Sequence, residues 1–373
     1  LEGNLGIRMH GVSYTYPEGS KAVLSDFTYD FKPGSLTAIV GETGVGKSTL
    51  IRLILALLRP DRGDIVFYNG QQEVVASPLT RCNLSYVPQG NTLVSGTIRD
   101  NLRMGNPHAT EEELKEALYL AVADFVFDLP EGMDTLCGER GSGLSEGQAQ
   151  RIAIARGLLR PGSILLLDEP TSYLDIKYKL EFLSVLQELQ KKKGLTVILS
   201  LHELELAARV SDRILCVDGA FVEQVGTPEE IFRPGHLSKL FQITQGSFEE
   251  ESQEMELAAV KGTPEVFVIA GNGSGRNTFR RLQREGIPFA AGLLWENDLD
   301  YPAAKALSSQ LFSVPAFEPV PEALLEQAMR CMDSCRKVIC CRESFGTLED
   351  AQKRLLAYAK ARGLSERDAQ NCV

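Results

Sequence analysis

The residues most able to do chemistry are GETGVGKST, residues 41–49, which have the spacing G-x-x-x-x-G-K-[ST]. They follow the apolar run LTAIV (36–40) and lead into the helical pattern TLIRLILALL. At such a strand-to-helix turn, glycines let backbone N–H groups point at phosphate oxygens, and the helix N-terminus adds partial positive charge. A glycine-rich turn that merely precedes a helix would not need the full spacing. The predicted phosphate-binding residues are Gly41, Glu42, Thr43, Gly44, Val45, Gly46, Lys47, Ser48 and Thr49.

An acidic pair complements this loop. Asp168 and Glu169 follow the apolar strand pattern ILLL (164–167). Beside a phosphate-binding loop, the first carboxylate suits Mg²⁺ and the second suits polarising a water molecule. The same pair could be a simple helix-start signal, which the company of residues 41–49 makes the weaker interpretation.

Length and composition predict a soluble globular protein with two hydrophobic cores, since 373 residues exceed the usual size of one domain and 43% are hydrophobic. The net charge of −11 disfavours non-specific nucleic-acid binding. The apolar run LIRLILALL (50–58) contains Arg52, so we expect no direct membrane insertion, and no signal peptide is visible. Leu1, standing in place of Met, suggests a trimmed N-terminus.

Eight cysteines at irregular spacings indicate reduced thiols rather than a disulfide framework. Cys331 and Cys335 would lie one helical turn apart, and Cys340 and Cys341 follow them. A metal site there is conceivable, but no histidine accompanies these residues. Small buried apolar side chains are the favoured interpretation.

Alternating strand and helix patterns predict a mostly parallel α/β domain over residues 1–245. Residues from about 90 to 160 instead read as an inserted helical subdomain, in which Thr110 is a candidate N-cap. An acidic stretch at 246–262 is expected to be a solvated linker or an exposed helix. Residues 263–373 then predict a second, small Rossmann-like α/β domain.

The second domain contains GNGSG (271–275) after the strand pattern VFVIA. A dinucleotide site is one interpretation, with Glu296 at about the position of a ribose-binding acid. The favoured interpretation is a structural turn, because a tight strand-to-helix connection needs glycine in any case. A regulatory small-molecule site and a dimer contact both stay open.

Residues 143–159, GLSEGQAQRIAIARGLL, resemble the signature helix of ABC ATPases, whose usual motif is LSGGQ. The resemblance implies that Ser145, Gly147 and Gln148 bind the ATP held by an opposite subunit, so that two subunits enclose two nucleotides. Glu146 departs from the family pattern by replacing a glycine, which puts an extra negative charge near the γ-phosphate.

Further positions match the same family in order. Tyr16 resembles the aromatic residue that stacks on adenine, Gln89 the Q-loop residue, residues 172–175 the D-loop, and His202 the switch histidine. Tyr16, Gln89 and His202 also have ordinary alternatives, as a core tyrosine, a turn glutamine and a surface histidine respectively. A neutral imidazole after a buried strand is able to hydrogen-bond a γ-phosphate.

The first domain resembles two branches of the family. Residues 95–102 and the X-loop-like Glu139, Arg140 and Gly141 resemble exporters. From residue 168 onward the chain, including its C-terminal domain, is similar to importer ATPases for iron siderophores, haem and cobalamin. The two styles meet at DEPTS (168–172), which suggests a recombined or engineered mosaic.

The resemblance implies an α/β P-loop NTPase of the ABC type that hydrolyses ATP with Mg²⁺. Its expected catalytic residues are Glu169, His202 and Gln89, and its expected metal ligands are Ser48, Gln89 and Asp168. The implied partners are a second ATPase subunit and membrane permease subunits, which places the chain in the cytoplasm on the inner face of the cell membrane. The alternatives are a nucleotide-gated regulatory module and a mosaic with weak ATPase activity.

Overall fold

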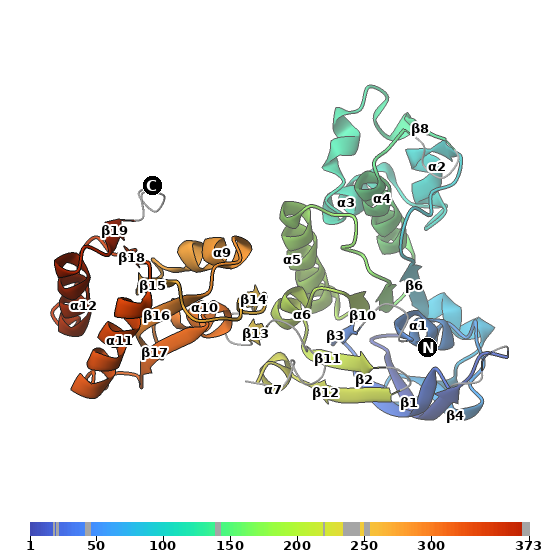
Figure 1. Ribbon diagram of the computed structural model, residues 1–373. Coiled ribbons are helices and arrows are strands. Elements are labelled where there is room, and N and C mark those ends of the chain that lie inside the picture. Colours follow the sequence, from blue (N-terminus) through green and yellow to red (C-terminus); the bar gives the residue numbers. More distant parts are fainter. Residues whose placement is uncertain are drawn as a thin grey trace. The chain divides into compact units, whose positions relative to one another are not determined.

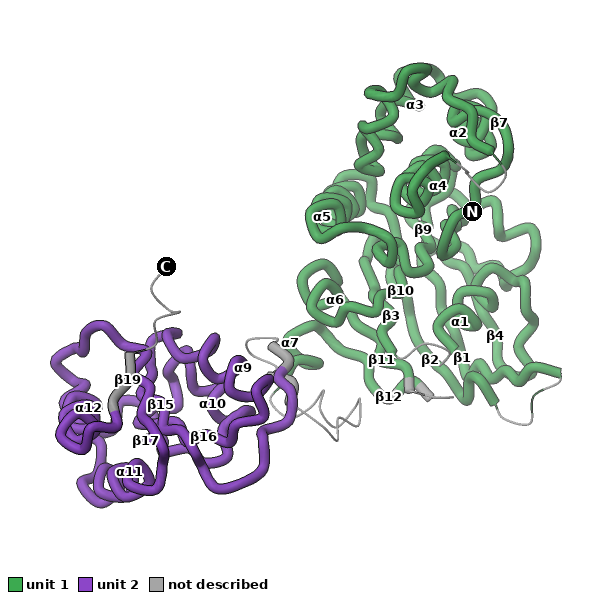
Figure 2. Tube along the Cα trace, turned by 45° about the horizontal axis from the view of Figure 1, so that its top comes forward, with its two compact units in different colours: residues 1–233 green, residues 234–373 purple. Residues whose placement is uncertain are grey.

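The computed structural model describes residues 1–17, 19, 22–41, 46–138, 143–218, 221–233, 247–249 and 254–367 (Figure 1). The chain divides into two compact units, residues 1–233 and residues 234–373 (Figure 2). Each unit has its own buried apolar clusters. Within the described ranges, no helix combines the length and the apolar character needed to cross a bilayer.

The first unit begins with an antiparallel sheet in the order β2-β1-β4-β5. Its strands are β1 (Gly6–Tyr14), β2 (Leu24–Phe31), β4 (Arg62–Tyr68) and β5 (Glu73–Val75). In β1, Ile7 and Met9 are buried whereas His10 is exposed, the period-two pattern of a strand with one face on a core. That core also takes the apolar face of helix α1 (Lys47–Ile54).

The second sheet carries the site. Its order is β12-β11-β3-β10-β9-β6, and every neighbouring pair is parallel except the antiparallel edge pair β11 and β12. The strands are β3 (Leu36–Val40), β6 (Leu84–Val87), β9 (Ile164–Leu167), β10 (Thr196–Leu201), β11 (Arg213–Asp218) and β12 (Phe221–Gly226). Strands β3, β9 and β10 are buried along their whole length, as expected for a parallel sheet covered on both faces. Because parallel strands end at one edge, the residues that follow β3, β6, β9 and β10 meet there.

Helices complete this α/β unit. They are α5 (Ile176–Lys193), α6 (Leu204–Val210) and α7 (Pro228–Ile231), with a 3₁₀ turn η1 (Pro78–Asn83) before β6. Helix α5 ends at Gly194 in a left-handed conformation, with three lysines in its last turn. Both features favour a helix C-terminus, since glycine accepts positive φ and cations complement the helix dipole.

A mainly helical segment lies between β6 and β9. It contains α2 (Ile98–Arg103), α3 (Glu111–Leu120), η2 (Asp124–Asp128), η3 (Gly132–Asp134) and α4 (Glu146–Leu159), with the short pair β7 (Gly96–Thr97) and β8 (Leu136–Cys137). Figure 1 shows α2, α3 and α4 grouped together. Thr97, Thr110 and Ser145 each begin a helix with a reciprocal capping box. The predicted N-cap at Thr110 is therefore confirmed.

The second unit contains a five-stranded parallel sheet in the order β17-β16-β15-β18-β19. Its strands are β15 (Val266–Ile269), β16 (Phe289–Trp295), β17 (Gln310–Val314), β18 (Lys337–Cys340) and β19 (Ser365–Arg367). Its helices are α9 (Arg276–Arg284), α10 (Tyr301–Leu307), α11 (Glu322–Ser334) and α12 (Asp350–Ala361). One apolar cluster joins the sheet to α9 and α10, and a second joins it to α11 and α12, so helices cover both faces. The predicted α/β character of this unit is confirmed.

The acidic stretch expected to be a linker or helix includes two short strands. These are β13 (Ser247–Glu249) and β14 (Glu254–Glu256), which pair in antiparallel fashion. The Glu256 carboxylate accepts from the Arg280 guanidinium of α9, with 2.9 Å between Arg280 Nε and Glu256 Oε1. The other residues of this stretch before 254 lie outside the described ranges.

Candidate active site

The predicted phosphate-binding loop begins where β3 ends and finishes on α1. Gly41 has φ 154° and Gly46 has φ 106°, values that side-chain-bearing residues rarely adopt. A Cβ atom at Gly46 would also lie 3.0 Å from the backbone oxygen of Val23. Both conformation and space therefore require glycine at 46. The predicted residues Glu42, Thr43, Gly44 and Val45 lie outside the described part of the chain.

Lys47 directs its ammonium into a buried polar centre at the end of β3. Its Nζ donates to the Gly41 carbonyl at 2.7 Å, and lies 3.3 Å from His202 Nδ1 and 3.5 Å from Glu169 Oε1. Burial lowers the pKa of Lys47, and the nearby Glu169 carboxylate partly opposes that effect. A buried ammonium of this kind is stabilised mainly by anionic partners.

Asp168 follows β9 and is held by a hydroxyl from the next strand. Ser200 Oγ on β10 donates to Asp168 Oδ1 at 2.7 Å and accepts from the backbone N–H of Glu169 at 2.8 Å. The backbone N–H of Asp168 donates to the Val87 carbonyl at the end of β6. Asp168, Glu169 and Ser200 are all buried. One hydroxyl thus orients both members of the acidic pair.

The Glu169 carboxylate is the point at which the predicted catalytic residues converge. Its Oε1 lies 2.6 Å from His202 Nε2, and its Oε2 accepts a hydrogen bond from the Gln89 side-chain amide. The residue is 7% exposed and has φ 48°, a left-handed conformation uncommon for a residue with a side chain. Strained backbone of this kind concentrates at functional sites. Lys47, Gln89 and His202 therefore hold Glu169 from three other segments of the chain.

Tyr16, the predicted adenine-stacking residue, lies beside the first turn of α1. Its hydroxyl is 3.1 Å from Thr49 Oγ1 and accepts from Arg52 at 3.4 Å. Its ring packs edge-on against Tyr14, with 5.0 Å between the ring centroids. Tyr16 therefore lies next to the phosphate-binding helix, and its stacking on adenine stays a prediction.

The predicted magnesium ligands Ser48, Gln89 and Asp168 present hydroxyl, amide and carboxylate oxygens, which are donors that Mg²⁺ prefers. Ser48 is exposed on α1, and the Gln89 side-chain nitrogen is engaged with Glu169, which leaves the amide oxygen for a cation. Among the described residues, no group of three or more His, Cys, Asp or Glu side chains could hold a metal ion. Protein sites for Mg²⁺ commonly supply few ligands and rely on substrate phosphates and water. The donor set fits Mg²⁺ bound together with a nucleotide.

The signature residues lie at the start of α4. Ser145 Oγ accepts from the backbone N–H of Gln148 at 3.2 Å, and Gln148 Oε1 accepts from the backbone N–H of Ser145 at 2.9 Å. A Cβ at Gly147 would lie 2.4 Å from the backbone oxygen of Tyr173, so glycine permits close packing of α4 on residues 172–175. Glu146 is exposed in the first turn.

In the part of the chain that the structure describes, Ser145 and Gln148 make no side-chain hydrogen bond to Lys47, Asp168 or Glu169. The two groups are linked indirectly, because Gly147 packs on residues 172–175 and Ser172 Oγ donates to Glu169 Oε2 at 3.4 Å. The predicted X-loop residues Glu139, Arg140 and Gly141 lie outside the described residues.

Two contributors to the site were missed at the sequence level. Ser200 lies two residues before His202, and the register that pairs Leu199 with Leu167 brings it beside Asp168. An in-register alignment of the two apolar strand patterns would have indicated this contact. The contact of Gly147 with the Tyr173 backbone depends on helix packing, for which the sequence holds no local signal.

The first unit has the features of an α/β P-loop nucleotide-binding unit. A buried parallel strand leads through a glycine turn into the helix that carries Lys47, and an acidic pair follows another strand of the same sheet. Residues 24–172 match the ABC transporter family. The first unit is therefore an ATPase domain of the ABC type. Residues 289–367 of the second unit match the MJ0874 family.

Similar proteins belong to the same class. The chain is 35% identical over 260 residues to the uncharacterized ABC transporter ATP-binding protein YfiB of Bacillus subtilis (strain 168), with 68% of this chain and 44% of YfiB covered. It is 38% identical over 240 residues to the cyclolysin secretion/processing ATP-binding protein CyaB of Bordetella pertussis, with 64% of this chain and 33% of CyaB covered. The structure of a bacterial Atm1-family ABC exporter with ATP bound aligns with a TM-score of 0.59 at 32% identity, covering 65% of this chain and 42% of the exporter. The chain thus spans less than half the length of each of these relatives.

CyaB and the Atm1-family protein are named for secretion and export, and the match in the second unit is to the MJ0874 family, whose name does not refer to importers. The importer resemblance expected for the second half is therefore not part of what the comparisons establish. Only an ABC-type ATPase domain followed by an MJ0874-family domain is established.

Proposed function

We propose that the chain hydrolyses ATP in order to power transport through a separate membrane partner. The observation that carries this proposal is the convergence of Lys47, Gln89 and His202 on the Glu169 carboxylate, next to the Asp168 carboxylate. These residue types at one sheet edge are what phosphoryl transfer to water requires.

Each residue has a distinct role in this proposal. Glu169 orients the attacking water, while Lys47 neutralises charge that develops on the transferred phosphoryl group. His202 hydrogen-bonds the γ-phosphate from the end of β10. Asp168, Ser48 and Gln89 would hold Mg²⁺, whose contribution is to neutralise phosphate charge and to align the nucleotide.

The arrangement of the signature residues supports dimerisation on ATP. Ser145 and Gln148 bond each other at the exposed start of α4 rather than the Lys47 centre of their own chain, so we assign them, with Gly147, to the site of a second ATPase subunit. Two chains would then enclose two nucleotides and separate after hydrolysis. We place the chain in the cytoplasm, on the inner face of the cell membrane against permease subunits.

The first prediction tests the hydrolytic role directly. Glu169→Gln keeps the size and polarity of the side chain but removes the carboxylate, so turnover should fall by roughly 10²–10⁴-fold while ATP binding is retained. Steady-state phosphate release and equilibrium nucleotide binding measure the two effects. Glu181→Gln, at an exposed position of α5, is the matched control and should behave as the unaltered protein. Unchanged turnover in Glu169→Gln would refute the assignment.

A nucleotide-gated regulatory module is the second candidate, favoured by the separate α/β unit at residues 234–373. In that case ATP would control dimerisation or ligand binding without a transporter. Reconstitution with the membrane partner separates the two, because a transport ATPase is stimulated by its permease and a regulatory module is not.

An importer-like second half, from residue 168 onward, would make the chain a mosaic of two branches of the family. Matches that cover 64% and 68% of the chain must include residues 168–172 wherever they begin, so exporter-type similarity continues past that motif. This favours one continuous ABC domain over two joined halves. Separate comparison of residues 1–167 and 173–233 would support a mosaic only if the halves returned relatives from different branches.

A further inference from the structure

The second unit has the topology in which a ligand crevice forms at the carboxyl edge of the sheet. From the central strand β15 the chain adds β16 and β17 on one side, and then β18 and β19 on the other. Strand order thus reverses between β15 and β18, and ligands of open α/β sheets bind outside the carboxyl ends of such strands.

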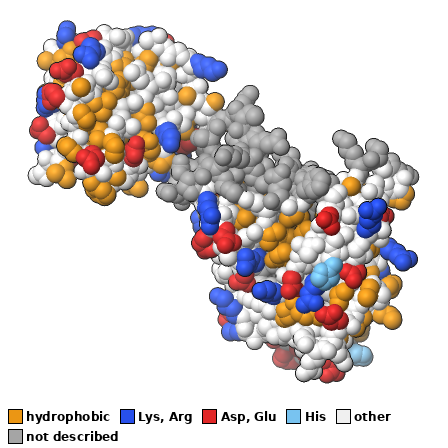
Figure 3. Space-filling view, turned by 90° about the horizontal axis from the view of Figure 1, so that it is seen from below, with side chains coloured by type: hydrophobic (Ala, Val, Ile, Leu, Met, Phe, Trp, Pro, Cys, Tyr) orange, Lys and Arg blue, Asp and Glu red, His pale blue; other side chains and the backbone are white. Residues whose placement is uncertain are grey.

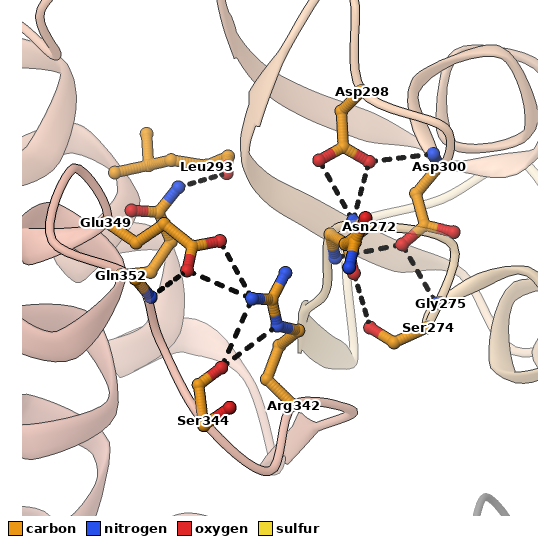
Figure 4. A network of polar contacts seen from close by, with 12 residues as sticks. Asn272, Ser274, Gly275, Leu293, Asp298, Asp300, Arg342, Ser344, Glu349 and Gln352 are labelled. Carbon is orange, nitrogen blue, oxygen red and sulfur yellow. Dashed lines mark hydrogen bonds and ion pairs between the residues drawn. The ribbon is translucent and has the colours of Figure 1, made fainter.

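The glycine loop at this edge is already filled by the chain's own carboxylates. Asp300 accepts from the backbone N–H groups of Gly271 and Gly275 at 2.8 and 2.9 Å, and both oxygens of Asp298 accept from Asn272 N–H at 3.0 Å (Figure 4). These amides are the ones that would cradle a phosphate in a dinucleotide site. Glu296, the candidate ribose-binding acid, is exposed and does not line the cavity described below. A phosphate would therefore have to displace two carboxylates, which argues against a dinucleotide and supports the structural-turn interpretation.

A second group of polar residues, centred on Arg342, lies at the end of β18 on the same edge of the sheet. The Arg342 guanidinium, after β18, donates to the Ser344 carbonyl at 3.1 Å and to Glu349 at 2.9 Å (Figure 4). The Glu349 carboxylate also accepts from the backbone N–H of Gly346. The loops after β15, β16 and β18 are thus held in place by internal hydrogen bonds.

A cavity of about 840 Å³ opens above these loops, which we call the C-terminal cavity. Its apolar wall includes four large side chains that lie at or beyond the carboxyl ends of three strands, namely Trp295, Leu299, Phe317 and Leu348. Leu299, Phe317 and Leu348 are 60%, 90% and 86% exposed, so large apolar surface faces solvent here. Exposed apolar side chains gathered around one concavity indicate a binding site, and the volume lies in the range of small-molecule pockets.

The charge lining the C-terminal cavity is negative. Of its four carboxylates, Glu349 is paired with Arg342, and the lining Arg354 is paired with Glu322 of α11. Glu318 is exposed and forms no ion pair among the described residues. Asp350 is also exposed, and its charge helps to raise the pKa of Arg354 on the same helix, while Asp298 accepts from backbone amides. Burial, and then the neighbouring Asp298 charge, raise the pKa of Asp300, as expected where carboxylates crowd one edge.

We propose that the C-terminal cavity binds a small organic cation, an amine or quaternary ammonium carried on an apolar body. The apolar wall accommodates the body, while Glu318 and Asp350 attract the positive charge. The Trp295 ring, whose indole N–H is anchored to the Glu318 carbonyl at 2.8 Å, offers an aromatic surface for the cation. Negatively charged nucleotides are excluded by the same carboxylates.

The chain contains one tryptophan, Trp295, so intrinsic tryptophan fluorescence reports on this cavity. Titrate the full chain with three probes that share one apolar body, namely phenylbutylamine, phenylbutanol and phenylbutyrate. We expect a saturable fluorescence change with the amine, an affinity for the amine about fivefold or more above that for the alcohol, and the weakest binding for the carboxylate.

Variants identify the groups responsible. Glu318→Gln and Asp350→Asn should each weaken amine binding by about two- to fivefold and leave alcohol binding unchanged, because each removes one attractive charge. Leu348→Ser should weaken the binding of both the amine and the alcohol, and a substitution at this exposed position carries little risk to folding. Glu285→Gln, an exposed acid at the end of α9 outside the cavity, is the matched control and should change neither.

Equal or reversed affinities for amine and carboxylate would overturn the proposal. So would the lack of a saturable change with the amine, or an equal effect of Glu285→Gln and Glu318→Gln. None of these outcomes depends on ATP hydrolysis by the first unit.

Discussion

At the scale of single residues, the acidic pair Asp168 and Glu169 is oriented by one hydroxyl, that of Ser200 on the next strand. Ser200 donates to Asp168 and accepts from the Glu169 backbone, and all three residues are buried. A buried carboxylate that loses such a donor is desolvated without compensation. Ser200 is therefore a positioning residue for the proposed hydrolysis.

Ser200→Ala should lower turnover by about tenfold or more and the free energy of unfolding by about 1–3 kcal/mol, because the buried Asp168 oxygen and Glu169 N–H lose their partner. Ser200→Thr retains a hydroxyl and should restore much of the turnover. Phosphate release and denaturant unfolding measure the two quantities. Ser184→Ala on α5, which removes only a bond to the Leu180 carbonyl, is the control. Equal turnover in the alanine and threonine variants would show that the hydroxyl does not position the pair.

Glu146 has opposing effects on folding and on the proposed dimer. In the first turn of α4 its carboxylate complements the helix dipole. In the proposed dimer the same carboxylate would repel the γ-phosphate of the ATP bound by the second subunit. Glu146→Gly should lower the midpoint of thermal unfolding and raise turnover by about two- to fivefold, since one like charge is removed. Glu112→Gly, in the first turn of α3, should have the thermal effect alone. A fall in turnover would argue that Glu146 is compatible with the closed dimer.

At the scale of elements, the contact between α4 and residues 172–175 is set by one missing side chain. Gly147→Ala would place a Cβ 2.4 Å from the Tyr173 backbone oxygen, and a backbone atom cannot move aside cheaply. Alanine in an exposed helix usually stabilises relative to glycine. Here we expect a loss of about 1–3 kcal/mol in the free energy of unfolding, together with reduced turnover.

Denaturant unfolding measures this loss, and Glu116→Ala is the control, because that exposed position in the middle of α3 already carries a Cβ. A neutral or stabilising Gly147→Ala would mean that α4 and residues 172–175 move apart readily.

The elements also show which features of the structure can be predicted from the sequence. The phosphate-binding turn, the acidic pair after β9 and the Thr110 cap are local signals, so each is predictable from spacing and residue type. The contacts of Ser200 with Asp168 and of Asp300 with the glycine loop join segments 25 to 32 residues apart. Strand register and loop packing create these contacts, and neither is encoded in a short pattern.

At the scale of the whole molecule, each chain has a net charge of −11, yet the proposed function requires two chains to meet. The face drawn in Figure 3 has acidic and basic side chains close together on both units, so local pairs can offset the net repulsion. Long-range repulsion between exposed charges falls as salt shortens the screening length, from about 10 Å at 0.1 M to about 3 Å at 1 M.

Because Glu169→Gln should bind ATP but hydrolyse it slowly, this variant should form dimers with Mg²⁺ and ATP. The dimer fraction should rise with moderate salt, which screens the repulsion between the two chains. Light scattering coupled to size-exclusion chromatography measures the molecular mass. ADP should leave the chain monomeric, since the γ-phosphate that the second subunit contacts is missing. A chain that stays monomeric with ATP at every salt concentration would contradict dimerisation on nucleotide.

The pairing of Lys47 with Glu169 has a thermodynamic consequence for nucleotide affinity. The ammonium that should receive phosphate is held 3.5 Å from a carboxylate of the same chain, so phosphate and Glu169 are competitors for one cation. Apparent affinity then equals the intrinsic affinity multiplied by the fraction of molecules in which the pair is open. Neutralising Glu169 should accordingly tighten ATP binding while it stops turnover, so the residue that drives hydrolysis also sets the concentration of ATP at which the domain fills.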